Sequence, residues 1–317
     1  MGNFKIRSMR HGVVRIASFC LIGVLLIAGM FMLSAVSAFS GFFAAATVAD
    51  SALATGYFDI CPVIEKVRSQ DDSTKLIVGD SVCQQVFNAL QDCNSEYCVA
   101  GTYCTVGIPG QYNLVYEYLN AHPDATDVYL MIRPQSLDAQ FDSNRAYMYA
   151  VAPFVTMDAA HWDNETCKQL KETYWWYGIN AFVTPFIVNS PMLSKLYLSQ
   201  LDIRHHVDTY APSGFSEESK KYLLKLQQLC DERRVSLHLI PLPITDEASS
   251  YAVVENLLQI AEGTDLEDLL KEFSERVIYC PAEYFSDGQH FEFQNVSKQT
   301  IIQMIQEKNQ LLFDFND

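Results

Sequence analysis

A short apolar segment that ends in Gly79-Asp80-Ser81 constrains the fold of this chain more than any other feature. Residues 75–79 predict a buried strand, because a short apolar run closed by a turn signal is typical of a core strand. Apolar residues then recur at helical spacing as far as residue 90. The pattern predicts a sharp strand-to-helix turn with Ser81 at the helix N-terminus, where its backbone N–H and the helix dipole stabilise an anion.

Two interpretations of this turn stay open. In the first, Asp80 or Ser81 caps the helix, which is a common use of both residue types. In the second, Ser81 is a nucleophile and the local N–H groups stabilise its oxyanion intermediate. The segment Asp287-Gly288-Gln289-His290 favours the second interpretation. A serine hydrolase needs a base to take the serine proton and a carboxylate to orient that base.

Gly79-Asp80-Ser81 and Asp287-x-x-His290 resemble the first and last motif blocks of the SGNH/GDSL hydrolase superfamily. The resemblance covers roughly residues 74–312. It implies a three-layer α/β/α domain with a mainly parallel sheet. It also implies a catalytic triad of Ser81, His290 and Asp287.

The resemblance implies further oxyanion donors beside the N–H of Ser81. Gly110 matches the glycine of the second block, with Gly107 as the next choice, and a plain turn glycine is the alternative. The third block usually reads Gly-x-Asn-Asp, whereas this chain has Arg-Pro-Gln-Ser at 133–136. Gln135 falls where the asparagine is expected and carries the same amide group one methylene further out.

Three residues near these blocks are expected to contact substrate. For the arginine among them, an ion pair with Asp or Glu at the strand end is the competing interpretation. The three residues are Asp80, Arg133 and Gln111.

Strand and helix patterns alternate after residue 74 and predict an α/β domain over 74–317, with a mainly parallel sheet and helices on both faces. Active groups then gather at the carboxyl ends of the strands. A helix is expected from Ser216, another or a pair within 246–273, and a last one over 296–312. The predicted strands are 75–79, 96–105, 127–132, 235–242 and 277–279.

Residues 137–215 interrupt the alternation with an aromatic-rich insertion. Three interpretations stay open: a glycan groove, ordinary packing of large side chains, and an interfacial belt near a membrane. The aromatic residues of this segment include Tyr147, Tyr149, Phe154, Trp162, Tyr174, Trp175, Trp176, Tyr177, Phe182 and Phe186.

The N-terminal region predicts a single membrane span. Residues 13–33 are almost entirely apolar, and about 20 such residues cross a bilayer. A basic tail at 1–12 precedes them and no basic residue follows until Lys66, so the positive-inside rule places the N-terminus in the cytoplasm and the bulk outside. Residues 34–73 are expected to form a stalk or linker. A cleaved signal peptide is the alternative, because 34–38 offer a small-x-small pattern.

The charge balance restricts the partners. The net charge is −16, and beyond the four basic residues that precede Asp50 the chain carries 18 basic against 38 acidic residues. Such a surface disfavours nucleic acid and anionic lipid headgroups. A neutral polysaccharide or a small acyl donor is a more compatible partner, and no metal or nucleotide motif appears.

Eight cysteines follow Cys20, which lies in the predicted span. An even number outside the membrane permits disulfides, for which the cluster from Cys83 to Cys104 is the best candidate. Buried free thiols are the alternative.

Together these features predict a membrane-anchored extracytoplasmic serine esterase or O-acyltransferase that needs no cofactor. The expected substrate is an acyl ester, in particular an acetyl ester, of an envelope or exported polysaccharide. The first alternative is a non-catalytic SGNH-like envelope protein that binds glycan or a membrane acyltransferase partner. The second is a structural surface protein in which the three motif residues coincide by chance.

Overall fold

A computed structural model of the chain describes residues 18–26, 28–29, 52–88, 90, 94–102, 107–139, 141, 151–173 and 214–310. The chain divides into two compact units. One comprises residues 1–54 and 182–202, and the other comprises residues 55–181 and 203–317.

In the first unit, residues 18–26 and 28–29 are helical and expose large apolar side chains such as Phe19 and Leu26, and residues 52–54 begin the helix that continues into the second unit. Within the described ranges, no helix has the length and apolar character needed to cross a membrane. The predicted anchor at 13–33 extends beyond those ranges and stays a prediction. The predicted tail at 1–12 lies outside them.

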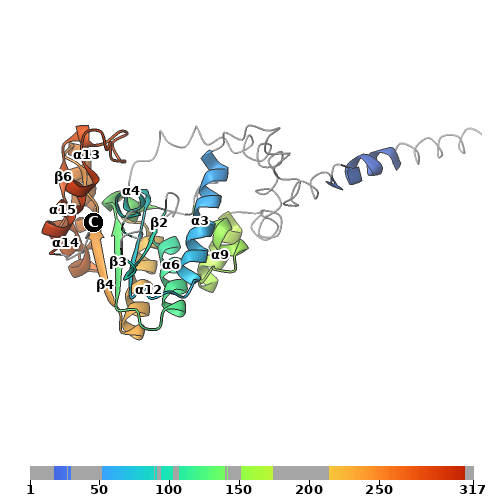
Figure 1. Cartoon of the computed structure of the whole chain (residues 1–317), viewed down its shortest axis with the longest axis horizontal. Helices are drawn as coiled ribbons and strands as arrows, with labels where there is room; N and C mark the ends of the chain where they lie inside the picture. Colours follow the sequence, from blue (N-terminus) through green and yellow to red (C-terminus); the bar gives the residue numbers. More distant parts are fainter. Residues whose placement is uncertain are drawn as a thin grey trace, which may run out of the picture. The chain divides into compact units, whose positions relative to one another are not determined.

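The second unit is built on a four-stranded sheet in which every neighbouring pair is parallel (Figure 1). The predicted α/β class and mainly parallel sheet are therefore confirmed, and each strand lies within its predicted range. In spatial order the strands are β2 (Tyr97–Gly101), β1 (Lys75–Gly79), β3 (Asp127–Ile132) and β4 (Ser236–Pro241).

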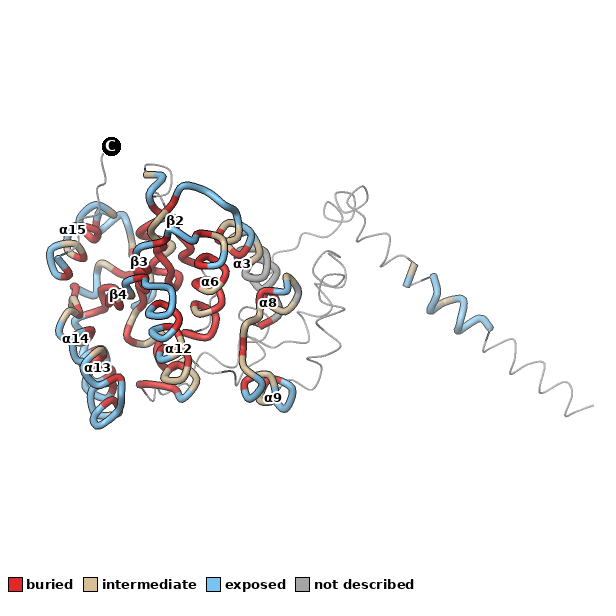
Figure 2. The backbone as a smooth tube through the Cα atoms, turned by 90° about the horizontal axis from the view of Figure 1, so that it is seen from below, coloured by how far each residue is buried: buried red, intermediate tan, exposed pale blue. Residues whose placement is uncertain are grey.

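Both faces of the sheet are buried, as Figure 2 shows for the strands. Successive strand residues point to opposite faces. On one face, Ile77 and Met131 share a core cluster with side chains of α4 (Ser81–Phe87) and α15 (Lys298–Asn309). On the other, Leu76 and Leu130 are fully buried, α6 (Gly107–Ala121) packs on β1, and α12 (Glu217–Arg233) packs on α6 and β4.

The predicted fifth strand does not join this sheet. Ile244–Thr245 (β5) pairs in parallel with Tyr279–Cys280 (β6), which forms a separate two-stranded sheet. The N–H of Leu242 donates to the carbonyl of Ile132 at the end of β3, but the N–H of Ile244 donates to the carbonyl of Ile278, so the chain leaves β3 between these two residues. The neighbouring helices are α13 (Ala248–Ala261), α14 (Glu267–Glu275) and the short η4 (Ala282–Tyr284).

The described part of the aromatic-rich insertion includes η1 (Pro134–Asp138), α8 (Ala152–Thr156) and α9 (Asn164–Thr173). Phe154 and Trp162 are buried with their rings edge to face at 6.1 Å, which agrees with ordinary packing for these two. Phe141 and Phe215, also within 137–215, are buried as well. Eight of the aromatic residues named for the insertion lie outside the described residues: Tyr147, Tyr149, Tyr174, Trp175, Trp176, Tyr177, Phe182 and Phe186.

The cysteines that the structure describes favour buried thiols over disulfides. Cys83 and Cys98 both carry free thiols and are buried. Burial raises the pKa of Cys98 to about 12 despite the opposing charge of Lys66. Cys93 and Cys104, the other members of the predicted disulfide cluster, lie outside the described residues.

Helix α3 (Ala52–Arg68) requires a correction to the predicted linker at 34–73. Ile60, Ile64 and Val67 recur at helical spacing and are fully buried. Arg68 forms two hydrogen bonds of 2.7 Å to the Glu117 carboxylate of α6. From residue 60 onward the segment is therefore part of the folded domain, because it buries an apolar stripe. Residues 34–51 lie outside the described residues.

Replacing Ile64 with alanine is expected to lower the free energy of unfolding by about 3 kcal/mol, because a fully buried side chain is lost and a cavity remains. Urea denaturation measures this change. The adjacent Glu65 is exposed, so Glu65→Ala is the matched control and is expected to change stability by less than about 0.5 kcal/mol. Equal stability of the two variants would show that α3 does not stabilise the domain.

Candidate active site

The turn after β1 gives Asp80 and Ser81 separate roles. Asp80 is the N-cap of α4, and its Oδ1 accepts hydrogen bonds from the N–H groups of Val82 at 3.0 Å and Cys83 at 3.3 Å. Ser81 is the first residue of the helix, and its hydroxyl is not used for the cap. The capping interpretation thus holds for Asp80, and it leaves the hydroxyl of Ser81 available for chemistry.

Glycine is required at the end of β1. A Cβ atom on Gly79 would lie 2.0 Å from the carbonyl oxygen of Met131 on β3 and 2.6 Å from Cβ of Cys83 on α4. Real side chains do not approach backbone that closely, so only glycine permits the helix to start this near the sheet. Close packing therefore explains the glycine of the tripeptide Gly-Asp-Ser, and helix capping explains the aspartate.

Gly79→Ala is expected to lower the free energy of unfolding by about 3–4 kcal/mol, since overpacking against backbone cannot be relieved by a side-chain rotation. Gly263→Ala is the control, because Gly263 has φ +74° but open space around it. That control is expected to cost about 1 kcal/mol, from backbone conformation alone. Thermal and urea denaturation of both variants measure the difference, and similar losses at the two sites would contradict the steric argument.

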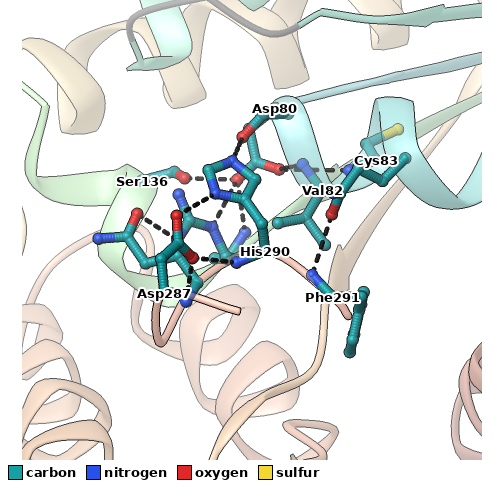
Figure 3. Close-up of polar contacts among 11 residues, drawn as sticks. Asp80, Val82, Cys83, Ser136, Asp287, His290 and Phe291 are labelled. Carbon is teal, nitrogen blue, oxygen red and sulfur yellow. Dashed lines mark hydrogen bonds and ion pairs between the residues drawn. The ribbon is translucent and has the colours of Figure 1, made fainter. Parts of the chain in front are cut away.

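Ser81, His290 and Asp287 form a continuous hydrogen-bonded series. Figure 3 shows the part of it between His290 and Asp287. Ser81 Oγ lies 2.8 Å from Nε2 of His290, and Nδ1 of His290 lies 2.8 Å from Oδ2 of Asp287. The other oxygen, Oδ1 of Asp287, accepts hydrogen bonds from the N–H groups of Gln289 and His290 at 3.0 and 2.7 Å. Gly288 supports this tight loop with φ +74°.

The charge of Asp287 fixes the tautomer of the histidine. Burial raises the pKa of the Asp287 carboxyl, but hydrogen bonds from the backbone and ring of His290 and from the N–H of Gln289 outweigh burial, so the pKa lies below its ordinary value. The group is therefore an acceptor-only carboxylate at neutral pH. His290 then carries its proton on Nδ1 and presents the lone pair of Nε2 to Ser81.

The backbone N–H of Ser81 is available to an incoming group. The amides of Val82 and Cys83 donate to the Asp80 side chain, and that of Gln84 donates to the Asp80 carbonyl. Among the described residues, the N–H of Ser81 has no acceptor. It is thus the first-turn amide of α4 that can bind a developing oxyanion.

The predicted second and third oxyanion donors are less well placed. Helix α6 begins at Gly107, so Gly110 lies in its first turn and not in the turn that precedes the helix. Gly107, with φ +69° at the helix start, fits the predicted turn better. Gln135 lies in η1, and its Oε1 is buried without a hydrogen-bond partner in the described part of the chain.

Gln111 and Asp80, two of the predicted substrate contacts, are buried. Gln111 is only 1% exposed, because α6 turns it into the interior. Both oxygens of Asp80 are used within the protein: Oδ1 caps α4, and Oδ2 accepts from Ser136 Oγ at 2.6 Å and from Arg133. The ion-pair interpretation of Arg133 agrees with its Nε–Oδ2 distance of 3.3 Å to Asp80.

Cys83 is not a second nucleophile. Its thiol is fully buried, and burial together with the charge of Asp80 raises its pKa well above the ordinary value. The thiol therefore stays protonated.

Three residues of the site had no signal in the sequence. Gln85 lies on α4, Ser136 lies in η1, and Gln289 lies between the two loop members of the series. Glutamine and serine are common surface residues, and only the three-dimensional contacts distinguish these three from others.

A comparison with family models gives no match, and comparisons with curated proteins and with solved structures give none either. The resemblance to SGNH/GDSL hydrolases rests on the motifs of the sequence and stays a prediction.

Proposed function

We propose that this chain is a serine esterase or O-acyltransferase with a three-layer α/β/α domain of SGNH type. The observation that supports this most directly is the series Ser81 Oγ, His290 Nε2 and Nδ1, and Asp287 Oδ2, with both distances at 2.8 Å. A hydroxyl, an imidazole and a carboxylate in this order are the parts that nucleophilic acyl transfer requires.

In the proposed mechanism, Ser81 Oγ attacks the acyl carbonyl while His290 Nε2 takes the serine proton. His290 then gives this proton to the leaving alkoxide, and an acyl ester on Ser81 remains. Asp287 holds the imidazole in its tautomer and stabilises the imidazolium. The Ser81 N–H supplies one oxyanion donor, and Gly107 or Gly110 of α6 and Gln135 are the candidates for others.

The second half of the reaction decides between hydrolase and transferase. Water or a sugar hydroxyl attacks the acyl ester, with His290 as the base in either case. The acidic composition and the predicted anchor favour a neutral envelope polysaccharide as ester substrate or acyl acceptor, outside the cytoplasm.

A second candidate is a non-catalytic envelope protein that binds glycan or a membrane acyltransferase. Two observations favour it: residues 133–136 replace the usual Gly-x-Asn-Asp, and Ser81 is only 7% exposed.

Covalent labelling separates the two candidates. The protein and its Ser81→Ala variant are incubated with a fluorophosphonate probe, and intact mass and peptide mapping locate any adduct. We expect one adduct on Ser81 in the parent protein and none in the variant. A folded parent protein that stays unlabelled would favour the binding candidate.

A further inference from the structure

The loop that carries the base is held on both sides of His290. This active-site loop, residues 286–291, is largely exposed, and the side chain of Asp287 within it is 55% exposed. Gln289, on one side of His290, accepts a hydrogen bond at its Oε1 from Arg133 Nη1 at 2.8 Å. Phe291, on the other side, donates its N–H to Gln85 Oε1 at 3.1 Å (Figure 3). These two contacts are called the flanking bonds here.

The first flanking bond leads back to the cap of the nucleophile helix. Arg133 donates from its backbone N–H at 3.2 Å and from Nε at 3.3 Å to Oδ2 of Asp80. Ser136 adds a third donor to the same oxygen at 2.6 Å. The side chains of Arg133 and Asp80 are 12% and 8% exposed, so the guanidinium is fixed before it reaches Gln289.

The second flanking bond comes from the same helix as the nucleophile. Gln85 lies four residues after Ser81, and residues four apart share one face of a helix. Both flanking bonds therefore connect the loop to the segment that sets the position of Ser81 Oγ.

Other backbone contacts of the loop are local. Ser286 N–H donates to the carbonyl of His290 at 2.8 Å, and Glu292 N–H donates to the carbonyl of Tyr284 at 2.8 Å. Such bonds shape the loop but do not fix its distance from α4. Phe285 and Phe291 are buried in the core cluster that includes Val86 of α4, which brings the loop near this helix. The flanking bonds add directional contacts on both sides of His290.

We propose that Arg133 and Gln85 are positioning residues that hold His290 Nε2 at hydrogen-bonding distance from Ser81 Oγ by binding Gln289 and the Phe291 N–H. The proposal rests on the proposed function, because it concerns the same site. Neither side chain touches the reacting atoms. Their effect is on geometry, and a displacement of about 1 Å between reacting groups costs on the order of 100-fold in rate.

The test uses the full chain with near-isosteric replacements that remove one acceptor each. Gln289→Met removes the first flanking bond and leaves the ion pair of Asp80 with Arg133 intact. Gln85→Met removes the second. Gln289→Glu keeps an acceptor oxygen for Arg133 and serves as the conservative variant. Gln84→Met is the matched control, because Gln84 neighbours Gln85 on α4 but makes no side-chain bond to the described loop.

Two quantities are measured: the rate of Ser81 labelling by the fluorophosphonate probe, and amide hydrogen exchange in the peptide that covers the loop. We expect each methionine variant at 85 or 289 to label about 10- to 100-fold more slowly and to exchange faster in the loop, with an unchanged unfolding midpoint. Gln289→Glu and Gln84→Met are expected to stay within about threefold of the parent rate.

Labelling within twofold of the parent rate in both Gln289→Met and Gln85→Met would overturn the positioning role while leaving the proposed function intact. A folded parent protein that is not labelled at all would overturn the proposed function, and the positioning role with it. The two failures are therefore distinct.

Discussion

Ser81→Ala is expected to reduce kcat for an activated acetyl ester by about 10⁵- to 10⁶-fold, with little change in stability. The reason is that the hydroxyl within 2.8 Å of His290 Nε2 is the only group of the series that can form the acyl ester. Without it, the remaining imidazole and amide groups can assist only direct attack by water. Initial rates over a range of ester concentrations measure the change.

Ser69→Ala is the control for this experiment, because Ser69 is exposed and its hydroxyl bonds only to the carbonyl of Lys66 in the described structure. It is expected to keep the parent rate. Turnover by Ser81→Ala at a rate near that of the parent protein would exclude the serine mechanism.

Asp287→Asn is expected to reduce kcat by about 10³- to 10⁴-fold at neutral pH. An asparagine amide can donate to Nδ1 of His290, which places the imidazole proton on Nε2. In that tautomer Nε2 donates to Ser81 Oγ and cannot accept its proton. The loss should appear in kcat more than in KM, because the substrate site is not altered. A variant with more than a tenth of the parent kcat would contradict the orienting role of Asp287.

The same substitution makes a prediction about pH and stability. The folded-state pKa of Asp287 is depressed, so its contribution to stability is present above the unfolded pKa, about 3.9, and is lost as the pH falls through the folded value. Since the side chain is 55% exposed, the contribution at pH 7 is expected to be below about 1 kcal/mol. Urea denaturation of the parent protein and Asp287→Asn should therefore show a small difference at pH 7 that shrinks as the pH falls below about 3.9. A difference that grows on acidification would contradict the assigned sign.

Features with a local cause could be predicted from the sequence. The strands β1 to β4 lie within their predicted ranges, because buried parallel strands read as short apolar runs. Ser216 caps α12 and accepts from the N–H of Ser219, as its capping pattern indicates. The series of Ser81, His290 and Asp287 came from two motifs, each of which is a local turn.

Features with a non-local cause could not be predicted. Residues 277–279 predict a strand, but they do not determine with which other strand it pairs. The pairing of β6 with β5 could therefore not be predicted. The contribution of α3 to stability depends on the surface against which its apolar residues pack, and that surface is formed by other parts of the fold. Helix α6 begins at Gly107, and the burial of Gln111 depends on how this helix is rotated about its axis. Gln85 and Gln289 gain their roles only from contacts between residues that lie 206 and 156 positions apart in the chain.

The sequence separation of 209 residues between Ser81 and His290 has a consequence for the order of events in biosynthesis. Chains are made from the N-terminus, and long-range contacts form late, because a long loop must close before they contribute. Ser81 is therefore synthesised and packed on its strand long before its base exists. A nascent chain, or one cut anywhere before residue 286, holds a serine with ordinary alcohol reactivity. Under the proposed function, acyl transfer would therefore begin only when the last tenth of the polypeptide has docked, and incomplete molecules would not consume acyl donors.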